Sequence, residues 1–189
     1  MLTRLLKRML FGFSILLLSI PAFPASVDTL AGIKNFKTPA ANTYSGGQAS
    51  EAQFTALAEA GVKHVINLRP ASEMLDFKES ALVEGKGMRY HVLPVSGLTD
   101  LKVKTVKRLE QILQQVGEEK AFFHCSSGNR VGAVMALRAA LMKGENKTAA
   151  LTLGRNWGLT RWEPEIQRLL EIREYKVGEY KTGGYKIRK

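Results

Sequence analysis

The segment that most constrains the fold of this chain is an apolar run followed by a cysteine, a short polar loop and a helix. The apolar run Ala121–Phe123 predicts a buried strand, and Val131–Leu137 indicates the start of a packed helix. Between them lie Cys125 and a loop that ends at Arg130. A strand, a tight loop and a helix N-terminus in this order direct backbone N–H groups at a bound anion. The sequence therefore predicts an anion-binding loop that contains a cysteine.

The chemistry of this loop is that of a nucleophile beside a phosphate site. The field at a helix N-terminus favours the thiolate form of a cysteine, and the thiolate is the nucleophilic form. An arginine such as Arg130 can bind a phosphate through two parallel hydrogen bonds. Cys125 is the only cysteine, so no intramolecular disulfide can form. A buried, inert cysteine is the common alternative, but the position of Cys125 at a strand end before a polar loop favours the nucleophile.

Strands and helices alternate along the chain, which indicates parallel pairing. A capping box, Ser50 with Gln53, marks the first clear helix start. The pattern predicts a three-layer α/β sandwich with a small, mainly parallel sheet, in which the Cys loop joins a central strand to a helix. Ligands of such sheets bind beyond the carboxyl ends of the strands, where Cys125 falls. The expected strands are 42–47, 62–68, 88–95 and 121–123, and the expected helices are 51–60, 77–84, 101–116, 131–142, 146–157 and 164–173, after a segment 26–41 with little periodicity.

The N-terminus has the pattern of a targeting segment. Three basic residues, Arg4, Lys7 and Arg8, precede the apolar run 9–20, and small residues follow at 21–26. This pattern predicts a secretory signal peptide, residues 1–25, cleaved after Ala25. An uncleaved anchor in the inner membrane is the alternative. We therefore expect an exported protein, periplasmic or secreted, with one domain over residues 26–173.

The charge of the chain favours anionic partners. The chain has 28 basic and 17 acidic residues, and three of the basic ones lie in the targeting segment. The rest of the chain therefore has 25 basic and 17 acidic residues, a net charge of +8. Such a domain is expected to bind phosphorylated substrates or anionic surfaces, and export argues against nucleic acid. Residues 174–189 form a basic Tyr/Lys/Gly tail that we expect to be flexible. It is either solvated or in contact with an anionic surface.

Several segments together resemble a known family. The chain, over about residues 36–172, is similar to a bacterial phosphatase-like family of the cysteine-dependent (dual-specificity and tyrosine) phosphatase superfamily, as in the phosphatase-like domain of beta-lactamase-hydrolase-like proteins. The segments that carry the resemblance are Tyr44–Gln48, Ala60–Pro70, Leu93–Val95, His124–Arg130, Arg155–Thr160 and Glu163–Pro164.

The resemblance implies a two-step phosphatase mechanism without a cofactor. A cysteine thiolate attacks the phosphorus of a phosphomonoester, such as protein phosphotyrosine or phosphoserine, and forms a phosphocysteine that water then hydrolyses. No metal is expected, because one cysteine and three scattered histidines give no metal-ligand spacing. The implied catalytic residues are Cys125, Arg130 and Asp100 as general acid, the phosphate-binding residues are Ser126, Ser127, Gly128, Asn129 and Arg130, and the supporting residues are His124 and Ser96.

The chain also departs from the usual phosphatase pattern at three points. The loop has four residues between Cys125 and Arg130 where phosphatases usually have five, and Val131 replaces the usual Ser or Thr after the arginine. Ser96 stands where dual-specificity phosphatases carry an aspartic acid, and Asp100, the nearest carboxylate, could instead cap the following helix. Two alternatives therefore stay open. One is a phosphate-binding module without turnover, and the other is a rhodanese-type sulfurtransferase with a persulfide on Cys125.

Overall fold

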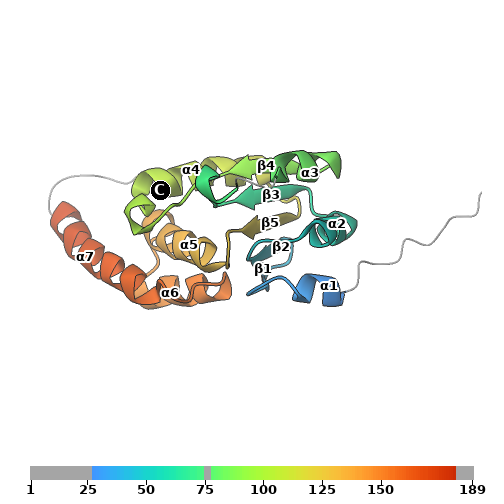
Figure 1. Ribbon diagram of the computed structural model, residues 1–189. Coiled ribbons are helices and arrows are strands. Elements are labelled where there is room, and N and C mark those ends of the chain that lie inside the picture. The colour runs from blue at the N-terminus through green and yellow to red at the C-terminus, as the bar shows by residue number, and fades with distance from the viewer. Residues whose placement is uncertain (1–26, 75–77, 182–189) are drawn as a thin grey trace, which may run out of the picture.

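The centre of the molecule is a five-stranded sheet with helices on both faces (Figure 1). The computed structural model describes residues 27–74 and 78–181. The strand order is β1-β2-β5-β3-β4; β1 runs antiparallel to β2, and the other neighbours pair in parallel. The expected α/β sandwich with a mainly parallel sheet is confirmed. The strands are β1 (Lys37–Ala40), β2 (Thr43–Gly46), β3 (His64–Asn67), β4 (Arg89–Val92) and β5 (Ala121–His124).

Helices alternate with most of the strands along the sequence. The capping box predicted at Ser50 and Gln53 is present at the start of α2. No helix within residues 27–74 and 78–181 has both the length and the apolar character needed to cross a membrane. The helices are α1 (Val27–Ala31), α2 (Glu51–Glu59), α3 (Glu79–Gly85), α4 (Val103–Val116), α5 (Asn129–Met142), α6 (Lys147–Asn156) and α7 (Glu163–Lys181), with 3-10 turns η1 (Ala71–Glu73) and η2 (Leu98–Asp100).

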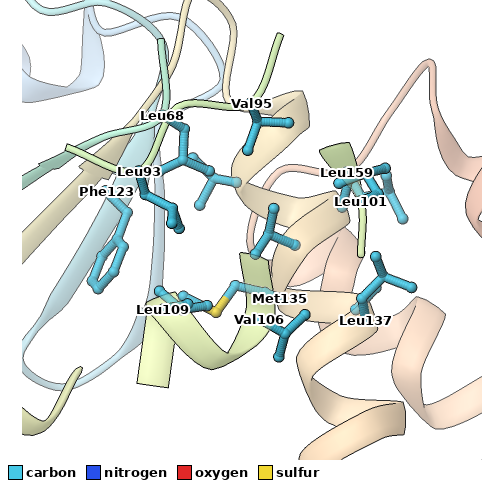
Figure 2. Close-up of a cluster of buried hydrophobic side chains, with 14 of the residues drawn as sticks. Leu68, Leu93, Val95, Leu101, Val106, Leu109, Phe123, Met135, Leu137 and Leu159 are labelled. Carbon is cyan, nitrogen blue, oxygen red and sulfur yellow. The ribbon is translucent and has the colours of Figure 1, made fainter. Parts of the chain in front are cut away.

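Strand β5 carries a core on each face because successive strand residues point to opposite sides. Phe122 packs in one apolar cluster with Phe54 of α2 and Val83 of α3. Phe123 packs in the other, among residues of α4 and α5 such as Leu109 and Met135 (Figure 2). The sheet is thus buried on both sides, which explains the continuous apolar run of β5.

The sheet register places three strand ends side by side. Gly46 of β2 and Asn67 of β3 both pair with His124, the last residue of β5. The backbone N–H of Leu68 donates to His124 O at 2.8 Å, and that of Cys125 donates to Gly46 O at 3.3 Å. The segments that follow β2, β3 and β5 therefore leave the sheet at one edge, and Cys125 lies there.

Some expected boundaries are wrong. Residues 26–41, described from the sequence only as a segment with little periodicity, contain α1 and the edge strand β1, whose proline breaks the usual strand pattern. Helix α5 begins at Asn129, two residues before the apolar run at Val131. Helix α7 continues to Lys181 rather than ending at Arg173, because residues 174–181 hold one glycine and no proline. The predicted signal peptide, Phe77 at the expected start of α3, and residues 182–189 lie outside the described residues.

Candidate active site

Cys125 is the first residue after β5 and is fully buried. The backbone N–H of Gly128 points at it, with the nitrogen 3.1 Å from Sγ. Helix α5 begins at the next residue, so the positive end of its dipole also faces this loop. The loop thus directs a backbone N–H at the sulfur, which is the arrangement that an anion-binding loop requires.

The sharp turn of the loop depends on Gly128 and on an asparagine from the start of the chain. Gly128 has a φ of 80°, and a Cβ there would lie 2.8 Å from Asn35 Nδ2. Asn35 Nδ2 donates to Ser127 O at 3.2 Å and to Gly158 O at 2.8 Å. Asn35 therefore fixes the loop against the turn before α7, a role that no motif in the sequence revealed.

The side chain of Asn129, expected to bind phosphate, turns away from the loop. Its Oδ1 accepts hydrogen bonds from Thr160 N at 2.8 Å, Thr160 Oγ1 at 3.1 Å and Trp162 N at 3.2 Å. Asn129 is 2% exposed. It anchors the start of α5 to the α6–α7 connection, so its backbone N–H is the part of it that an anion could use.

Arg130 closes the loop and is held by the ends of neighbouring strands. Its Nη1 donates to Val95 O at 3.1 Å, beyond β4. Its Nη2 donates to Ser126 Oγ at 2.9 Å and to Glu73 Oε2 at 2.8 Å. The guanidinium therefore lies at the loop, but a carboxylate from η1 occupies one of its nitrogens. Sequence reasoning missed Glu73.

Asp100 and Ser96, both expected near the site, contact each other. The backbone N–H of Ser96 donates to Asp100 Oδ2 at 2.7 Å. The connection from Ser96 to Asp100 follows Val95, whose carbonyl holds Arg130. Both residues therefore lie on a loop whose contact with the site is the hydrogen bond from Arg130 to the backbone oxygen of Val95. Asp100 belongs to η2 and precedes α4 without capping it, because the N-cap position is Lys102.

A buried polar network lies on the other side of β5, around His124. His124 Nε2 is 2.9 Å from Glu79 Oε1, and both side chains are almost wholly buried. The N–H direction is not aligned for a hydrogen bond, so the contact is electrostatic. Tyr90 OH donates to Glu79 Oε1 at 2.9 Å, and Gln48 Nε2 donates to Oε2.

The network lowers the pKa of Glu79 although burial alone would raise it. The contact with His124 and its charge, together with hydrogen bonds from Gln48 and Tyr90, outweigh the cost of burial. The same burial, reinforced by the negative charge of Glu79, raises the pKa of Tyr90 despite its hydrogen bond from Asn67. Glu79 is therefore a carboxylate, and Tyr90 a neutral hydroxyl donor.

Arg69 joins this network to Arg130. Its Nη1 donates to Gln48 Oε1, and its Nη2 donates to the backbone oxygen of Glu73. Gln48 and Arg69 come just after β2 and β3, so the rule that ligand sites lie at carboxyl strand ends could have found them. Glu73 and Glu79 lie in the β3–β4 connection, where no spacing singles them out. Across the described residues no group of three or more His, Cys, Asp or Glu could hold a metal ion.

The loop and the sheet occur together in known structures. No family model and no curated protein matches the chain. A candidate phosphatase (DUF442) from Shewanella putrefaciens CN-32 is 28% identical, with 80% of this chain and 96% of that chain covered and a TM-score of 0.59. A candidate phosphatase from Neisseria meningitidis z2491 is 21% identical, covering 70% of this chain and 96% of its own, with a TM-score of 0.58. TpbA of Pseudomonas aeruginosa, solved with pTyr, is 17% identical, covering 78% and 88%, with a TM-score of 0.51.

These likenesses identify the fold. The strand–loop–helix arrangement around Cys125 and the five-stranded sheet are the fold of the cysteine-dependent phosphatase superfamily. Within that superfamily the chain is similar to the bacterial DUF442 candidate phosphatases, over 78–80% of its length. The resemblance inferred from the sequence is confirmed.

Proposed function

We propose that the chain is an exported, cysteine-dependent phosphatase that hydrolyses phosphomonoesters. The observation that carries the proposal is the loop geometry: a buried Cys125 with the Gly128 N–H aimed at its sulfur, at the N-terminus of α5 and beside Arg130. Backbone amides and a helix N-terminus favour an anion at this position, either a thiolate or a phosphoryl oxygen. The similar structures include candidate phosphatases and a PP-IP phosphatase.

In the first step, the Cys125 thiolate forms a bond to phosphorus while the bond from phosphorus to the ester oxygen breaks. The leaving oxygen takes a proton from a general acid, for which we propose Asp100. Arg130 and the loop amides bind the equatorial oxygens, where negative charge is concentrated. Glu73 has to leave Nη2 of Arg130 before the phosphate can use that nitrogen, because the two anions compete for it.

In the second step, water attacks the phosphocysteine, and the S–P bond breaks to regenerate the thiolate and release inorganic phosphate. Phosphatases usually assist this departure with a hydroxyl after the arginine, a position that Val131 fills here, 1% exposed within the core. The hydroxyl of Ser126 is held at the loop by Arg130 Nη2. We propose that Ser126 stabilises the departing thiolate in its place.

The test is hydrolysis of an aryl phosphate by the full chain under reducing conditions. Cys125→Ser and Arg130→Ala are expected to abolish turnover, and Asp100→Asn to slow esters with poor leaving groups most. Glu118→Gln, at an exposed carboxylate, is the matched control and should behave as the wild type. Turnover that survives Cys125→Ser would refute the proposed mechanism.

A phosphate-binding module is the second candidate, favoured by the Glu73–Arg130 ion pair and by Val131. It predicts that the wild type binds inorganic phosphate but hydrolyses no ester, and that Cys125→Ser binds phosphate with the same affinity. Sulfur transfer from thiosulfate to cyanide is the assay for the rhodanese-type alternative. The proposed substrates are phosphorylated proteins or small molecules, with phosphotyrosine tested first, since TpbA was solved with pTyr.

Export is the part of the proposal that rests on sequence alone. The basic residues Arg4, Lys7 and Arg8 before the apolar run 9–20 support it. Cell fractionation of a tagged full chain is expected to recover a shortened protein outside the cytoplasm. A full-length protein in the membrane fraction would support the uncleaved anchor, and a cytoplasmic one would refute export.

A further inference from the structure

Helix α4 has a solvent-facing side on which every charged residue is basic. Lys104, Lys107 and Arg108 are exposed on its first two turns, and Lys102 precedes them at the N-cap position. Residues three and four apart are neighbours on a helix, so Lys104, Lys107 and Arg108 lie together. Glu110 is the only acidic residue of α4, and its carboxylate pairs with an arginine of α5. We call the four cations the α4 basic face.

The stability of the fold does not explain the α4 basic face. None of its four cations forms an ion pair with another residue that the structure describes. Cations at the N-terminal end of a helix oppose its dipole, and like charges three or four residues apart repel each other. Lys102 makes no capping hydrogen bond, and the first turn of α4 has no acidic residue. The arrangement therefore disfavours the helix that carries it.

The next helix along the chain after α5 shows a different charge pattern. Lys147 of α6 pairs with Glu171 at 2.9 Å, and Arg155 pairs with Glu163 of α7. There, cations stabilise the packing of two helices of the same chain. The cations of α4 have no such partner among the described residues, so they are available to negative charges from outside the chain.

The α4 basic face is hollowed and has apolar side chains at one end. A hollow of about 490 Å³ is lined by Val103, Lys104, Lys107, Arg108 and Gln111. The side chains of Val103 and Leu98 are 39% and 38% exposed, among the few large hydrophobic residues with such exposure. With a rise of 1.5 Å per residue, the row from Lys104 to Gln111 is about 10 Å long. An extended peptide of about three residues has the same length.

We propose that the α4 basic face is a docking site for a short acidic segment of a protein partner, with an apolar side chain that contacts Val103 and Leu98. Charge complementarity supports this occupant, because carboxylates would find three cations within five residues. Lys102 N donates to Asp100 O at 2.9 Å, so the docking site begins beside the loop of the candidate active site. The proposal concerns binding alone and holds whether or not Cys125 supports ester hydrolysis.

A lipid surface fits this part of the molecule less well than a peptide. Helices that lie in a membrane interface present a broad apolar face, with cations on the polar side. The apolar side of α4 is already buried in the core, through Val106, Leu109 and Ile112. The hollow between the cations suits a narrow, extended chain better than a flat surface.

The test measures binding of a fluorescein-labelled peptide of six glutamates around a central leucine, by anisotropy, to the full chain. The variant Lys104→Gln, Lys107→Gln, Arg108→Gln keeps residues that favour helix and removes three charges. It is expected to bind the peptide at least about tenfold more weakly at low salt, as the loss of three partly exposed charge contacts implies. In 1 M salt, where charges are screened beyond about 3 Å, the difference should fall to about twofold.

The control variant is Lys37→Gln, Lys63→Gln, Lys143→Gln, which makes the same change in net charge at exposed positions of other segments. It is expected to bind the peptide within about twofold of the wild type. The basic residues of the C-terminal segment 174–189 are the same in all three proteins. An equal loss of affinity in both variants would mean that net charge alone attracts the peptide, and would overturn the proposal.

Two further readouts separate docking from other roles of the α4 basic face. The α4 variant is expected to melt at the same temperature as the wild type or higher, because it relieves repulsion at the start of the helix. A lower melting temperature would show that the cations serve the fold, and would overturn the proposal. So would phosphatidylglycerol vesicles that bind through the three cations when the peptide does not, since the occupant would then be lipid.

Discussion

Gly132 is the residue at which one added methyl group should do most damage to the position of the loop. It lies two residues after Arg130, on the face of α5 that meets α6 and the turn after it. A Cβ at Gly132 would overlap the backbone nitrogen of Leu159 and lie 2.6 Å from both Leu159 Cα and Gly154 O. All three neighbours are backbone atoms, which cannot move aside by changing a rotamer.

The size of the effect follows from these distances. Contacts of a carbon are normally about 3.5–4.0 Å, and the Cβ would lie 2.0 Å from Leu159 N, so Gly132→Ala requires α5 to move by about 1.5 Å. Overpacking of this kind costs about 1–3 kcal/mol, and here the contacts are with rigid backbone, so the upper end applies. Alanine gains about 1 kcal/mol of helix propensity over glycine. We expect Gly132→Ala to lower the free energy of unfolding by about 2 kcal/mol.

Urea denaturation measures this change, and Gly85→Ala is the control. Gly85 ends α3, and a Cβ added there would have no atom within 4 Å, so alanine is expected to be neutral or to stabilise by about 0.5–1 kcal/mol. Moving α5 also displaces the loop, so Gly132→Ala should slow Cys125 alkylation. A Gly132→Ala midpoint equal to that of the wild type would refute the view that this contact sets the position of α5.

Two further predictions concern the carboxylates around the loop. Glu73→Gln should strengthen phosphate or vanadate binding by about two- to fivefold, the contribution of a partly exposed ion pair, because the anion no longer has to displace Glu73 from Arg130. Isothermal titration calorimetry measures this affinity, and weaker binding by the variant would contradict the prediction. The folded-state pKa of Glu79 is lowered, so its contribution to stability is complete above about pH 4.5 and is lost as the pH falls through the folded-state value. Unfolding midpoints between pH 3 and 7 should therefore fall less steeply for Glu79→Gln than for the wild type, and parallel curves would contradict this.

The arrangement of the sheet could be predicted because its signals are local. The apolar run of β5, the capping box of α2 and the alternation of strands and helices each depend on a few neighbouring residues. The parallel sheet then followed from topology, and it placed Cys125 at a carboxyl strand end. The edge strand β1 and the length of α7 were missed, because a proline in an edge strand and a mixed, polar helix give weak local patterns.

The side-chain partners of the loop needed the tertiary structure. Asn35 lies 92 residues from Ser127, and Glu73 lies 57 residues from Arg130. Such pairs depend on strand register and on how the connections cross the sheet edge, and no spacing along the chain encodes them. The same holds for Asn129, which the sequence assigned to the phosphate and the fold uses to anchor α5.

The sequence was enough to single out Cys125 as the candidate nucleophile, Arg130 beside it and the class of fold, because these residues occupy one continuous strand–loop–helix segment whose geometry is local. Only the tertiary structure decided which charges surround that segment. It placed Glu73 against Arg130 and Glu79 against His124. Both glutamates belong to the β3–β4 connection, which passes the Cys125 loop because β3 pairs with both β4 and β5. Electrostatic interactions act through space, so the charge environment of Cys125 is a property of the folded sheet edge.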